Sequence, residues 1–208
     1  MYLDKTLQFY LDELASAKST PGGGSTAAVS GAMGAALASM VARLTIGKAD
    51  YADVQAEVEG ILQQTELLRE RFQRLMQADI DAYGKLAASF KLPRTTDDEK
   101  KTRNKAIQEG LVAAALVPLE MVECSAELAR YCRRIAEIGN VNVLSDIATG
   151  AMLASSAGTG AAWMVRANLQ AMKDLEMVTI LSDRLGKALD TITEYTQQIT
   201  SIVTTPHS

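Results

Sequence analysis

Histidine and cysteine are scarce in this chain of 208 residues, which has two cysteines and a single histidine, His207, beside its C-terminus. Zinc sites built on histidine and general-base catalysis by imidazole are therefore excluded unless the C-terminal tail folds back. Cys124 and Cys132 lie about two turns apart in a helical segment, too far along one helix for an easy disulfide. Because no signal-peptide pattern is present either, we expect reduced thiols and a cytoplasmic protein.

The chain also lacks a basic face and a linker. Its formal net charge is -4, and its lysines and arginines are dispersed among acidic residues, so nucleic acid is not an expected partner. No run rich in proline, glycine and serine divides the sequence, so we expect a single domain over residues 1–208. No segment alternates apolar and polar residues between turns as a strand does, so we expect an all-α, multi-helix bundle.

Two stretches have no charged residue at all, residues 25–42 and 147–165. They approach the length that spans a membrane, but Ala, Gly, Ser and Thr replace the Leu, Ile and Phe that would favour insertion into a bilayer. Small residues recur in both stretches at steps of three and four. We therefore expect a central pair of buried Gly/Ala-rich helices that pack on each other, and no membrane partner.

Hydrophobic periodicity predicts the remaining helices. The expected segments are residues 4–18, 53–90, 97–138 and 174–203. Asp4 is the expected cap of the first segment, and Pro118 predicts a kink or a break inside the third. Trp163 and the nine methionines are expected to fill the core.

The motif Pro21-Gly22-Gly23-Gly24-Ser25 precedes the first uncharged stretch. Three glycines after a proline do not propagate a helix, so we expect a loop that leads into a helix capped by Ser25 or Thr26. The free N–H groups of a first helical turn can hold an anion or another polar ligand. The motif lacks the Gly-Lys-Ser/Thr ending of a nucleotide-binding loop. The alternative is a flexible turn before a core helix.

Asp79 falls on the apolar side of the helix expected over residues 53–90. Eleven residues at about 100° each place it about 20° from Leu68, whereas Asp81 points the opposite way. A carboxylate directed at a core must be paired, protonated or in use, because burying it unpaired costs several kcal/mol. The pattern leaves open a functional Asp79 and a structural one that pairs with a cation or a helix end.

Other polar residues have both a functional and a structural interpretation. Glu109 stands near a helix entrance, where the helix dipole favours acidic residues in any case. Asp146 is either a site carboxylate or a helix cap, and Asn140 and Asn142 are either ligand contacts or turn formers. Arg166 is either a partner for these acids or a surface residue.

Several motifs, taken together, resemble the formiminotransferase-cyclodeaminase C-terminal domain family. They follow one another over nearly the whole chain: Pro21-Gly22-Gly23-Gly24-Ser25, Asp79-Ile80-Asp81-Ala82-Tyr83, Leu92-Pro93, Gln108-Glu109-Gly110-Leu111, Val117-Pro118-Leu119, Gly139-Asn140 and Ser145-Asp146. Residues 29–37 and 44–48 look most like the stand-alone methenyltetrahydrofolate cyclohydrolases of the family. Relatives usually carry a bulkier aliphatic residue before Asn168, which leaves the role of Arg166 open.

The resemblance implies an all-helical homodimer that acts on a small-molecule folate substrate without a metal or redox cofactor. The implied reaction is hydrolysis of 5,10-methenyltetrahydrofolate to 10-formyltetrahydrofolate, which needs a base for water and an acid for the leaving nitrogen. The candidate site residues are then Asp79, Asp146, Glu109 and Lys48 for catalysis and Gly22, Gly23, Gly24, Ser25, Tyr83, Asn140, Asn142 and Arg166 for substrate binding.

Two other functions remain open at the level of sequence. A formiminotetrahydrofolate cyclodeaminase, which closes the same ring with loss of ammonia, would use nearly the same residues. A protein of another class, a non-catalytic helical folate-binding or assembly protein, would retain the fold. The presence of the glycine motif together with Asp79 favours an enzyme over a mere scaffold.

Overall fold

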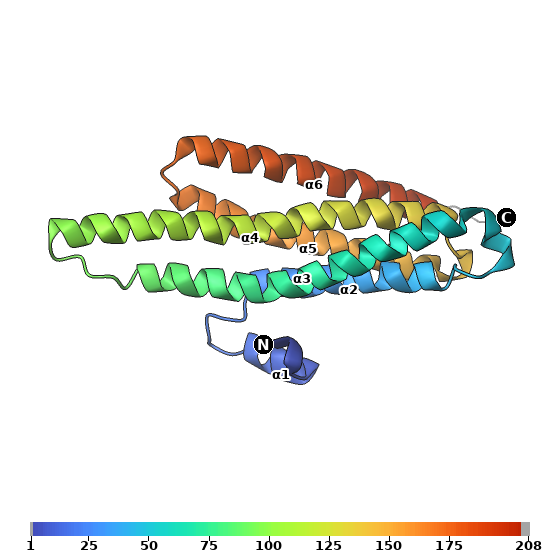
Figure 1. The fold of residues 1–208 in the computed structure, drawn as a ribbon, viewed down its shortest axis with the longest axis horizontal. Helices are drawn as coiled ribbons and strands as arrows, with labels where there is room; N and C mark the ends of the chain where they lie inside the picture. The colour runs from blue at the N-terminus through green and yellow to red at the C-terminus, as the bar shows by residue number, and fades with distance from the viewer. Residues whose placement is uncertain (1, 205–208) are drawn as a thin grey trace.

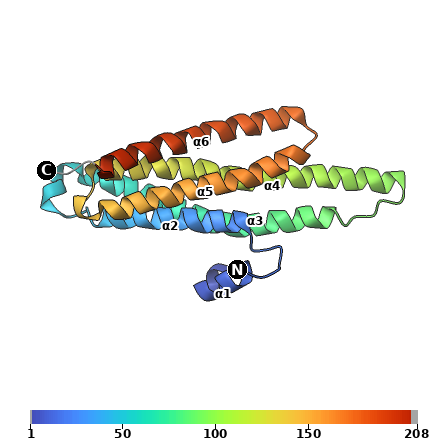
Figure 2. The ribbon, with the colours of Figure 1, turned by 180° about the vertical axis from the view of Figure 1, so that it is seen from behind.

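The computed structural model describes residues 2–204, so His207 lies outside the described residues. Four long helices form the body of a bundle: α2 (Gly23–Arg43), α3 (Gln55–Ser89), α4 (Asp97–Ile138) and α5 (Leu144–Ala171). α6 (Leu175–Thr204) packs along α4 and α5, and the short α1 (Leu7–Leu14) stands off from the bundle beside α2 (Figure 1, Figure 2). Short 3-10 segments cover Tyr2–Asp4, Ala49–Val54 and Val141–Val143. No strand occurs between residues 2 and 204, which confirms the all-α fold.

Threonine side chains cap both α4 and α1. Thr96 caps α4 by accepting a hydrogen bond from the Glu99 N–H at 3.2 Å, and the Glu99 carboxylate accepts the Thr96 N–H at 2.9 Å. α1 is capped by Thr6, whose hydroxyl accepts from the Phe9 N–H at 3.1 Å. The predicted cap at Asp4 is therefore wrong, because the chain first makes a separate 3-10 turn that ends at that residue.

The predicted break at Pro118 is absent, since α4 continues as one helix through the proline. A proline in a helix leaves the carbonyl four residues earlier, here that of Ala114, without its usual N–H donor. The side-chain amide of Asn168 on α5 donates to this carbonyl at 2.9 Å. A neighbouring helix thus supplies the hydrogen bond that the proline removes.

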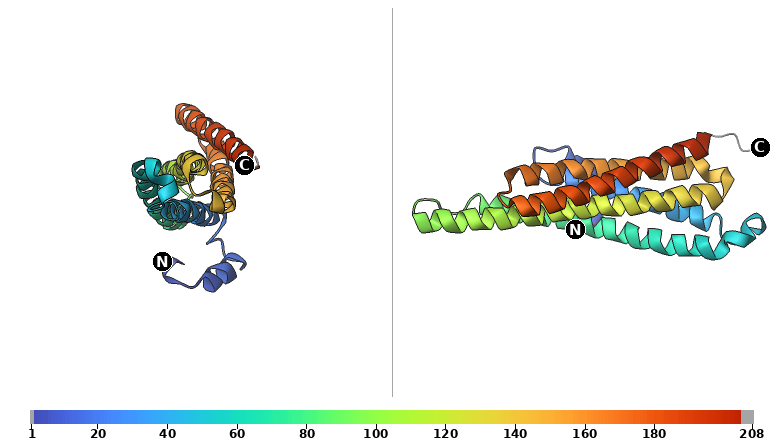
Figure 3. Two further views of the ribbon diagram at one scale, coloured as in Figure 1. Left: turned by 90° about the vertical axis from the view of Figure 1, so that its right-hand side faces the viewer. Right: turned by 90° about the horizontal axis from the view of Figure 1, so that it is seen from above.

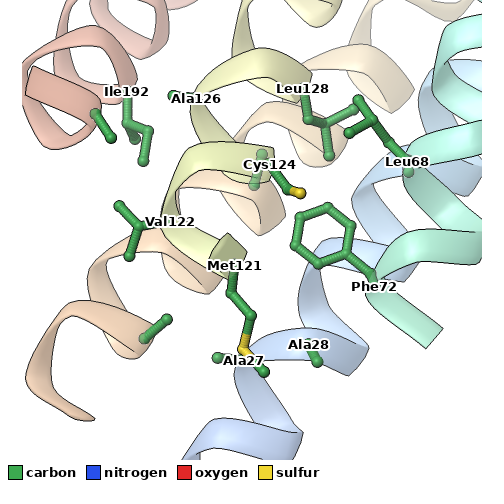
Figure 4. Packing of buried hydrophobic residues seen from close by; sticks show 14 of the residues in the cluster. Ala27, Ala28, Leu68, Phe72, Met121, Val122, Cys124, Ala126, Leu128 and Ile192 are labelled. Carbon is green, nitrogen blue, oxygen red and sulfur yellow. The ribbon is translucent and has the colours of Figure 1, made fainter. Parts of the chain in front are cut away.

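Small residues let α2 pack directly on α5, as the two Gly/Ala-rich stretches predict. A methyl group built on Gly34 would lie 2.8 Å from the carbonyl oxygen of Gly150, which is backbone and cannot turn aside. On another side of α2, Gly31 leaves the space that the ring of Phe72 from α3 fills. Figure 4 shows this fully buried ring beside Cys124 of α4.

Within the described residues, α2 is the one helix that is long and apolar enough to span a membrane by length and composition. A core helix of a soluble protein passes the same test. In this structure 56% of the apolar window of α2 is buried against the other helices of the bundle.

Trp163 is not a core residue, contrary to the expectation from sequence. Its side chain is 65% exposed on α5, where the Arg166 guanidinium lies 5.2 Å from the ring centroid. Three methionines, Met33, Met40 and Met152, are also exposed. The physical reason is that the inner sides of α2 and α5 hold mostly small residues where the two helices pack on each other, so several large side chains of these helices point outward.

The close contact of α2 with α5 can be tested with alanine at two glycines. Gly34→Ala should lower the free energy of unfolding by about 1–3 kcal/mol, because a backbone must move to admit the methyl group. Gly186→Ala in α6 is the matched control: nothing lies near that position, and alanine in a helix interior is favoured over glycine by about 0.5–1 kcal/mol. Urea unfolding measures both variants. A stability of Gly34→Ala equal to or above the wild type would contradict this packing.

Candidate functional site

A cleft of about 270 Å³ opens at the N-terminus of α2, where side chains from α3, α4 and α5 converge. Five of the residues predicted for the site line it together: Gly22, Gly23, Gly24, Asp79 and Tyr83. Residues 19–22, which connect α1 to α2, contribute to one wall through Ser19, Thr20 and Gly22. The cleft therefore joins two motifs that are more than fifty residues apart in the sequence.

The Asp79 carboxylate lies directly against the first turn of α2. Its oxygens occupy the space that a Cβ atom on Gly24 would need, and the backbone N–H of Ser25 donates a hydrogen bond to it. The carboxylate thus satisfies one of the free N–H groups of the helix and lies at the positive end of the helix dipole. Asp79 takes part in none of the ion pairs found among residues 2–204.

Burial and hydrogen bonding act on Asp79 in opposite directions. Loss of solvent contact raises the pKa of the carboxyl group, and the N–H of Ser25 lowers it by a smaller amount. The net effect is a raised pKa in a cleft that a ligand can enter. A group of this kind accepts and holds a proton more readily than an ordinary surface aspartate.

The glycines are part of α2 rather than a loop before it. Gly22 is the cap and Gly23 the first helical residue, so the predicted caps Ser25 and Thr26 lie inside the helix. The Ser25 hydroxyl instead bonds back to Gly22, accepting its N–H at 3.2 Å and donating to its carbonyl at 2.9 Å. Helix propensity decides little in a first turn, where the N–H groups need partners from elsewhere. Ser25 and Asp79 supply those partners.

Tyr83 and Asn168 face the cleft from two different helices. Tyr83 lies one turn after Asp79 on α3 and is 44% exposed. Asn168 on α5 uses its amide NH₂ group to donate to the carbonyls of Ala114 and Met164, at 2.9 Å each, so its carbonyl oxygen is the atom it can offer to a ligand. Asn168 was missed as a site residue. The sequence points to Asn168 only indirectly: Pro118 leaves the Ala114 carbonyl without its usual N–H donor, so a side-chain donor from another helix is needed there.

Four of the predicted site residues lie at the opposite end of α2, and we call them the distal group: Lys48, Asn140, Asn142 and Asp146. Asn140 marks this position, since its side-chain amide donates to the Leu44 carbonyl at 3.0 Å. At 1.5 Å per residue, the helix between Gly24 and Leu44 separates the distal group from the cleft by about 30 Å. Asp146 lies in the first turn of α5 and is not its cap. Within one chain, the distal group does not meet Asp79.

Glu109 and Arg166 lie on the surface of the chain and do not line the cleft. The Glu109 side chain is 68% exposed, with Lys105 3.8 Å away. Arg166 stacks over Trp163 on the outer side of α5. Arg166 thus has the surface position of its structural interpretation, whereas the helix entrance expected at Glu109 is wrong, because α4 begins twelve residues earlier, at Asp97.

The raised pKa of Asp79 gives a testable pH dependence of stability. The value for an unfolded chain is about 3.9, so the contribution of Asp79 to stability is fully present below that pH and is lost as pH rises through the folded-state pKa. Asparagine does not ionise, so the melting temperature of the wild type relative to Asp79→Asn should fall as pH rises across this window. Asp81→Asn, at an exposed site on the same helix, is the control and should show no such fall. A difference that grows with pH would instead mark Asp79 as a paired charge.

Comparisons with known proteins agree with this fold over most of the chain. The family model for formiminotransferase-cyclodeaminase matches residues 6–187. Methenyltetrahydrofolate cyclohydrolase of Methylorubrum extorquens is 40% identical over 171 residues, which are 82% of this chain and 82% of that protein. Formimidoyltransferase-cyclodeaminase of Rattus norvegicus is 33% identical over 83% of this chain, which spans only 32% of the rat protein.

A solved structure gives the same result in three dimensions. The crystal structure of formiminotetrahydrofolate cyclodeaminase from Thermotoga maritima has a TM-score of 0.89 with this chain and 28% sequence identity, over 98% of each. The two chains therefore share one fold over nearly their whole length. Because the family model and the fold both cover most of its length, the chain belongs to the formiminotransferase-cyclodeaminase family of folate-processing enzymes.

Proposed function

We propose that this protein hydrolyses 5,10-methenyltetrahydrofolate to 10-formyltetrahydrofolate. The observation that carries the proposal is the desolvated carboxylate of Asp79, placed in a cleft beside a helix N-terminus. The identity of 40% with a methenyltetrahydrofolate cyclohydrolase, over most of both chains, supports this reaction over others of the family.

The attacking water gives up both of its protons in this reaction, of which the leaving nitrogen takes one and solvent takes the other. Water adds to the amidinium carbon between N5 and N10 and loses a proton to a base, which gives a neutral carbinolamine. The carbon–N5 bond then breaks as the base gives its proton to N5 and takes up the proton of the hydroxyl group, which leaves the formyl group on N10 and one proton to be released to solvent. A site for this reaction needs a group that accepts a proton in the first step and returns one in the second.

Asp79 fits this requirement because the charge of the substrate changes the pKa of its buried carboxyl group. The methenyl substrate carries a positive charge on the amidinium, which would stabilise the ionised carboxylate and offset the cost of its burial. As water adds, that positive charge disappears, and the carboxylate becomes a better proton acceptor. Its raised pKa then favours holding the proton until N5 takes it.

The other cleft residues can position the substrate. The exposed Gly23 lets a ligand approach the first turn of α2 closely, while the Tyr83 hydroxyl and the Asn168 carbonyl oxygen can bond to polar ring edges. Placing the reactive carbon within hydrogen-bonding reach of Asp79 is the main task of such contacts.

A second candidate activity is formiminotetrahydrofolate cyclodeaminase, favoured by the 28% identity and full coverage of the Thermotoga maritima structure. That reaction forms the methenyl ring and releases ammonia, so it acts on the same carbon and nitrogen. Asp79 would then transfer a proton to the leaving ammonia, whereas in the hydrolysis it takes a proton from the attacking water.

Separate incubations of the purified protein with the two substrates distinguish these activities. We expect rapid loss of the methenyl absorbance with 5,10-methenyltetrahydrofolate, and little ammonia from the formimino substrate. Ammonia release at a comparable or higher rate would move the assignment to the cyclodeaminase. Binding of folates without turnover of either substrate would leave a binding protein and refute the proposal.

Asp79 and its glycine neighbour should be needed for turnover. Asp79→Asn should lower kcat by a factor of about a hundred or more, as expected for loss of a general acid–base, whereas Asp81→Asn should change it little. Gly24→Ala should cause a comparable loss, because its methyl group takes the space of the Asp79 carboxylate. Gly84→Ala on α3 is the matched control and should lose little, since nothing lies within 4 Å of the added methyl group and Gly84 does not line the cleft. Near-normal turnover of a folded Asp79→Asn protein would assign the chemistry to another group.

A further inference from the structure

α1 stands off from the bundle, yet one of its side chains is buried against the candidate site (Figure 3). Tyr10 is 6% exposed, and among Leu7–Leu14 it is the one buried residue. Its hydroxyl group lies 3.2 Å from the Ser25 hydroxyl and 3.3 Å from the Thr26 hydroxyl, both in the first turn of α2. α1 is therefore joined to the helix end that holds Asp79.

The donor in this group of hydroxyls can be assigned by counting protons. Ser25 and Thr26 have one hydroxyl proton each, and both donate it to the Gly22 carbonyl, at 2.9 Å. Neither proton is left for Tyr10. The Tyr10 hydroxyl is therefore the donor, and its proton goes to the oxygen of Ser25 or Thr26. A phenylalanine at this position could not make that bond.

Ser25 needs the Tyr10 proton because its side chain is fully buried. The Ser25 oxygen accepts the Gly22 N–H at 3.2 Å and has a second lone pair, for which the Tyr10 hydroxyl is the partner. Ser25 is 0% exposed, so solvent does not replace that partner, and a buried acceptor without a donor is costly. The Tyr10 hydroxyl thus completes the hydrogen bonds that close the first turn of α2.

Ser25 also contacts Asp79, through its backbone. The Ser25 N–H donates to the Asp79 carboxylate, whose oxygens lie against Gly24. Because Gly22 and Tyr10 hold the Ser25 side chain, the direction in which the N–H of the same residue points is held with it. A change at Tyr10 is therefore transmitted to the carboxylate.

Tyr10 also holds one wall of the cleft in place. Residues 15–22 join α1 to α2 and line the cleft through Ser19 and Thr20. One end of this connection continues into α2, and the contact of Tyr10 with Thr26 holds the other end. The wall beside a bound substrate is thus fixed at both ends.

We propose that Tyr10 is a positioning residue of this site: its hydroxyl group, acting through Ser25, fixes the first turn of α2 where that turn holds the Asp79 carboxylate. Tyr10 does not line the cleft, so its effect on the reaction passes through the helix end. The inference rests on the proposed function for the role of Asp79, while the link from Tyr10 to Asp79 can be tested without any substrate.

This link predicts how the pKa of Asp79 responds to a change at Tyr10. The Ser25 N–H lowers the pKa of Asp79, so a first turn that holds this N–H less firmly leaves that pKa higher. Among the described residues, Tyr83 is the one other titratable group that lines the cleft. The elements packed against Asp79 bring only uncharged groups to the cleft: the glycines of α2, Ser19 and Thr20 before them, Ala114 of α4, and Met164, Ala167 and Asn168 of α5.

Removing a single oxygen atom tests the proposal. Tyr10→Phe should lower kcat by a factor of about ten, the effect of one hydrogen bond, and leave the fold intact. Tyr2→Phe is the matched control. It removes the hydroxyl group of the ring that packs edge-on against Tyr10, with centroids 5.9 Å apart, and should leave kcat unchanged. Circular dichroism and the melting temperature verify the fold of both variants.

The pH dependence of kcat/KM separates positioning from a merely structural role. A base must be ionised to take a proton from water, so kcat/KM falls as pH drops through the pKa of Asp79 in the free enzyme. Tyr10→Phe should move this fall to higher pH by roughly half a unit, and Tyr2→Phe should not move it. A residue that only adds stability would leave the profile of the folded protein in place.

A double-mutant cycle tests whether Tyr10 acts through Ser25. Ser25→Ala removes the acceptor, so it should itself lower kcat and move the fall in kcat/KM to higher pH. Adding Tyr10→Phe to this variant should then cause little further loss, whereas two independent losses would multiply. Multiplied losses would refute the route through Ser25. If Tyr10→Phe does not fold, Ser25→Ala decides alone, and an unmoved profile would refute the same route.

Melting temperatures test the link without any substrate. The stability that Asp79 contributes is present below about pH 3.9 and is lost as pH rises through its folded-state pKa, so a higher folded-state pKa extends the loss to higher pH. The melting temperature of Tyr10→Phe relative to Tyr10→Phe/Asp79→Asn should therefore go on falling to a higher pH than that of the wild type relative to Asp79→Asn.

The outcomes separate this inference from the proposed function. Wild type that turns over neither folate would refute the proposed function, and the melting temperatures would still decide whether Tyr10 acts on Asp79. The same pH window in both pairs of proteins would overturn the inference. A folded Tyr10→Phe protein with wild-type kcat and an unmoved profile would overturn it as well, and would leave the hydrolase intact.

Discussion

The close approach of α2 to its neighbours is the constraint on which the rest of this structure depends. α2 packs against α3, α4 and α5 at the same time, and this is possible because most of its inward positions are glycine, alanine or serine. The absence of side chains at Gly31 and Gly34 admits the Phe72 ring on one side and the backbone of α5 on another. Dispersion contacts among closely packed backbones then replace the large interlocking side chains that hold most helical bundles.

The candidate site depends on the same close approach to α2, here at the N-terminus of the helix. With no side chain on Gly24, the carboxylate of Asp79 fits against the first turn of α2 and meets the free N–H of Ser25. The helix end thereby stabilises a negative charge that burial disfavours. The two interpretations of Asp79 from the sequence are not exclusive, because the residue completes a helix end and lines a cleft with the same oxygens.

Because the inner surfaces of α2 and α5 are made mostly of small residues, large apolar side chains of these helices are exposed on the outer surface. Where the inner positions are small, the larger apolar residues of α2 and α5 must point away from the core, and Met33, Met152 and Trp163 do so. Residues 23–42 of α2 and 147–165 of α5 carry no charged side chain, so the outer surface of these stretches is not highly polar either. Close packing inside the chain and exposed apolar side chains outside it are therefore two consequences of one pattern of residues.

The sequence by itself determined the helices, their order, the contact of α2 with α5 and the inward direction of Asp79. All of these depend on local periodicity, which specifies the side of a helix that each residue occupies. Only the tertiary structure decided that Asp146 and Lys48 lie about 30 Å from Asp79 within the chain, that Asn168 bonds to the carbonyl freed by Pro118, and that Trp163 is exposed. These facts depend on which helix ends meet and on what covers each face, and periodicity within a helix carries no information about either.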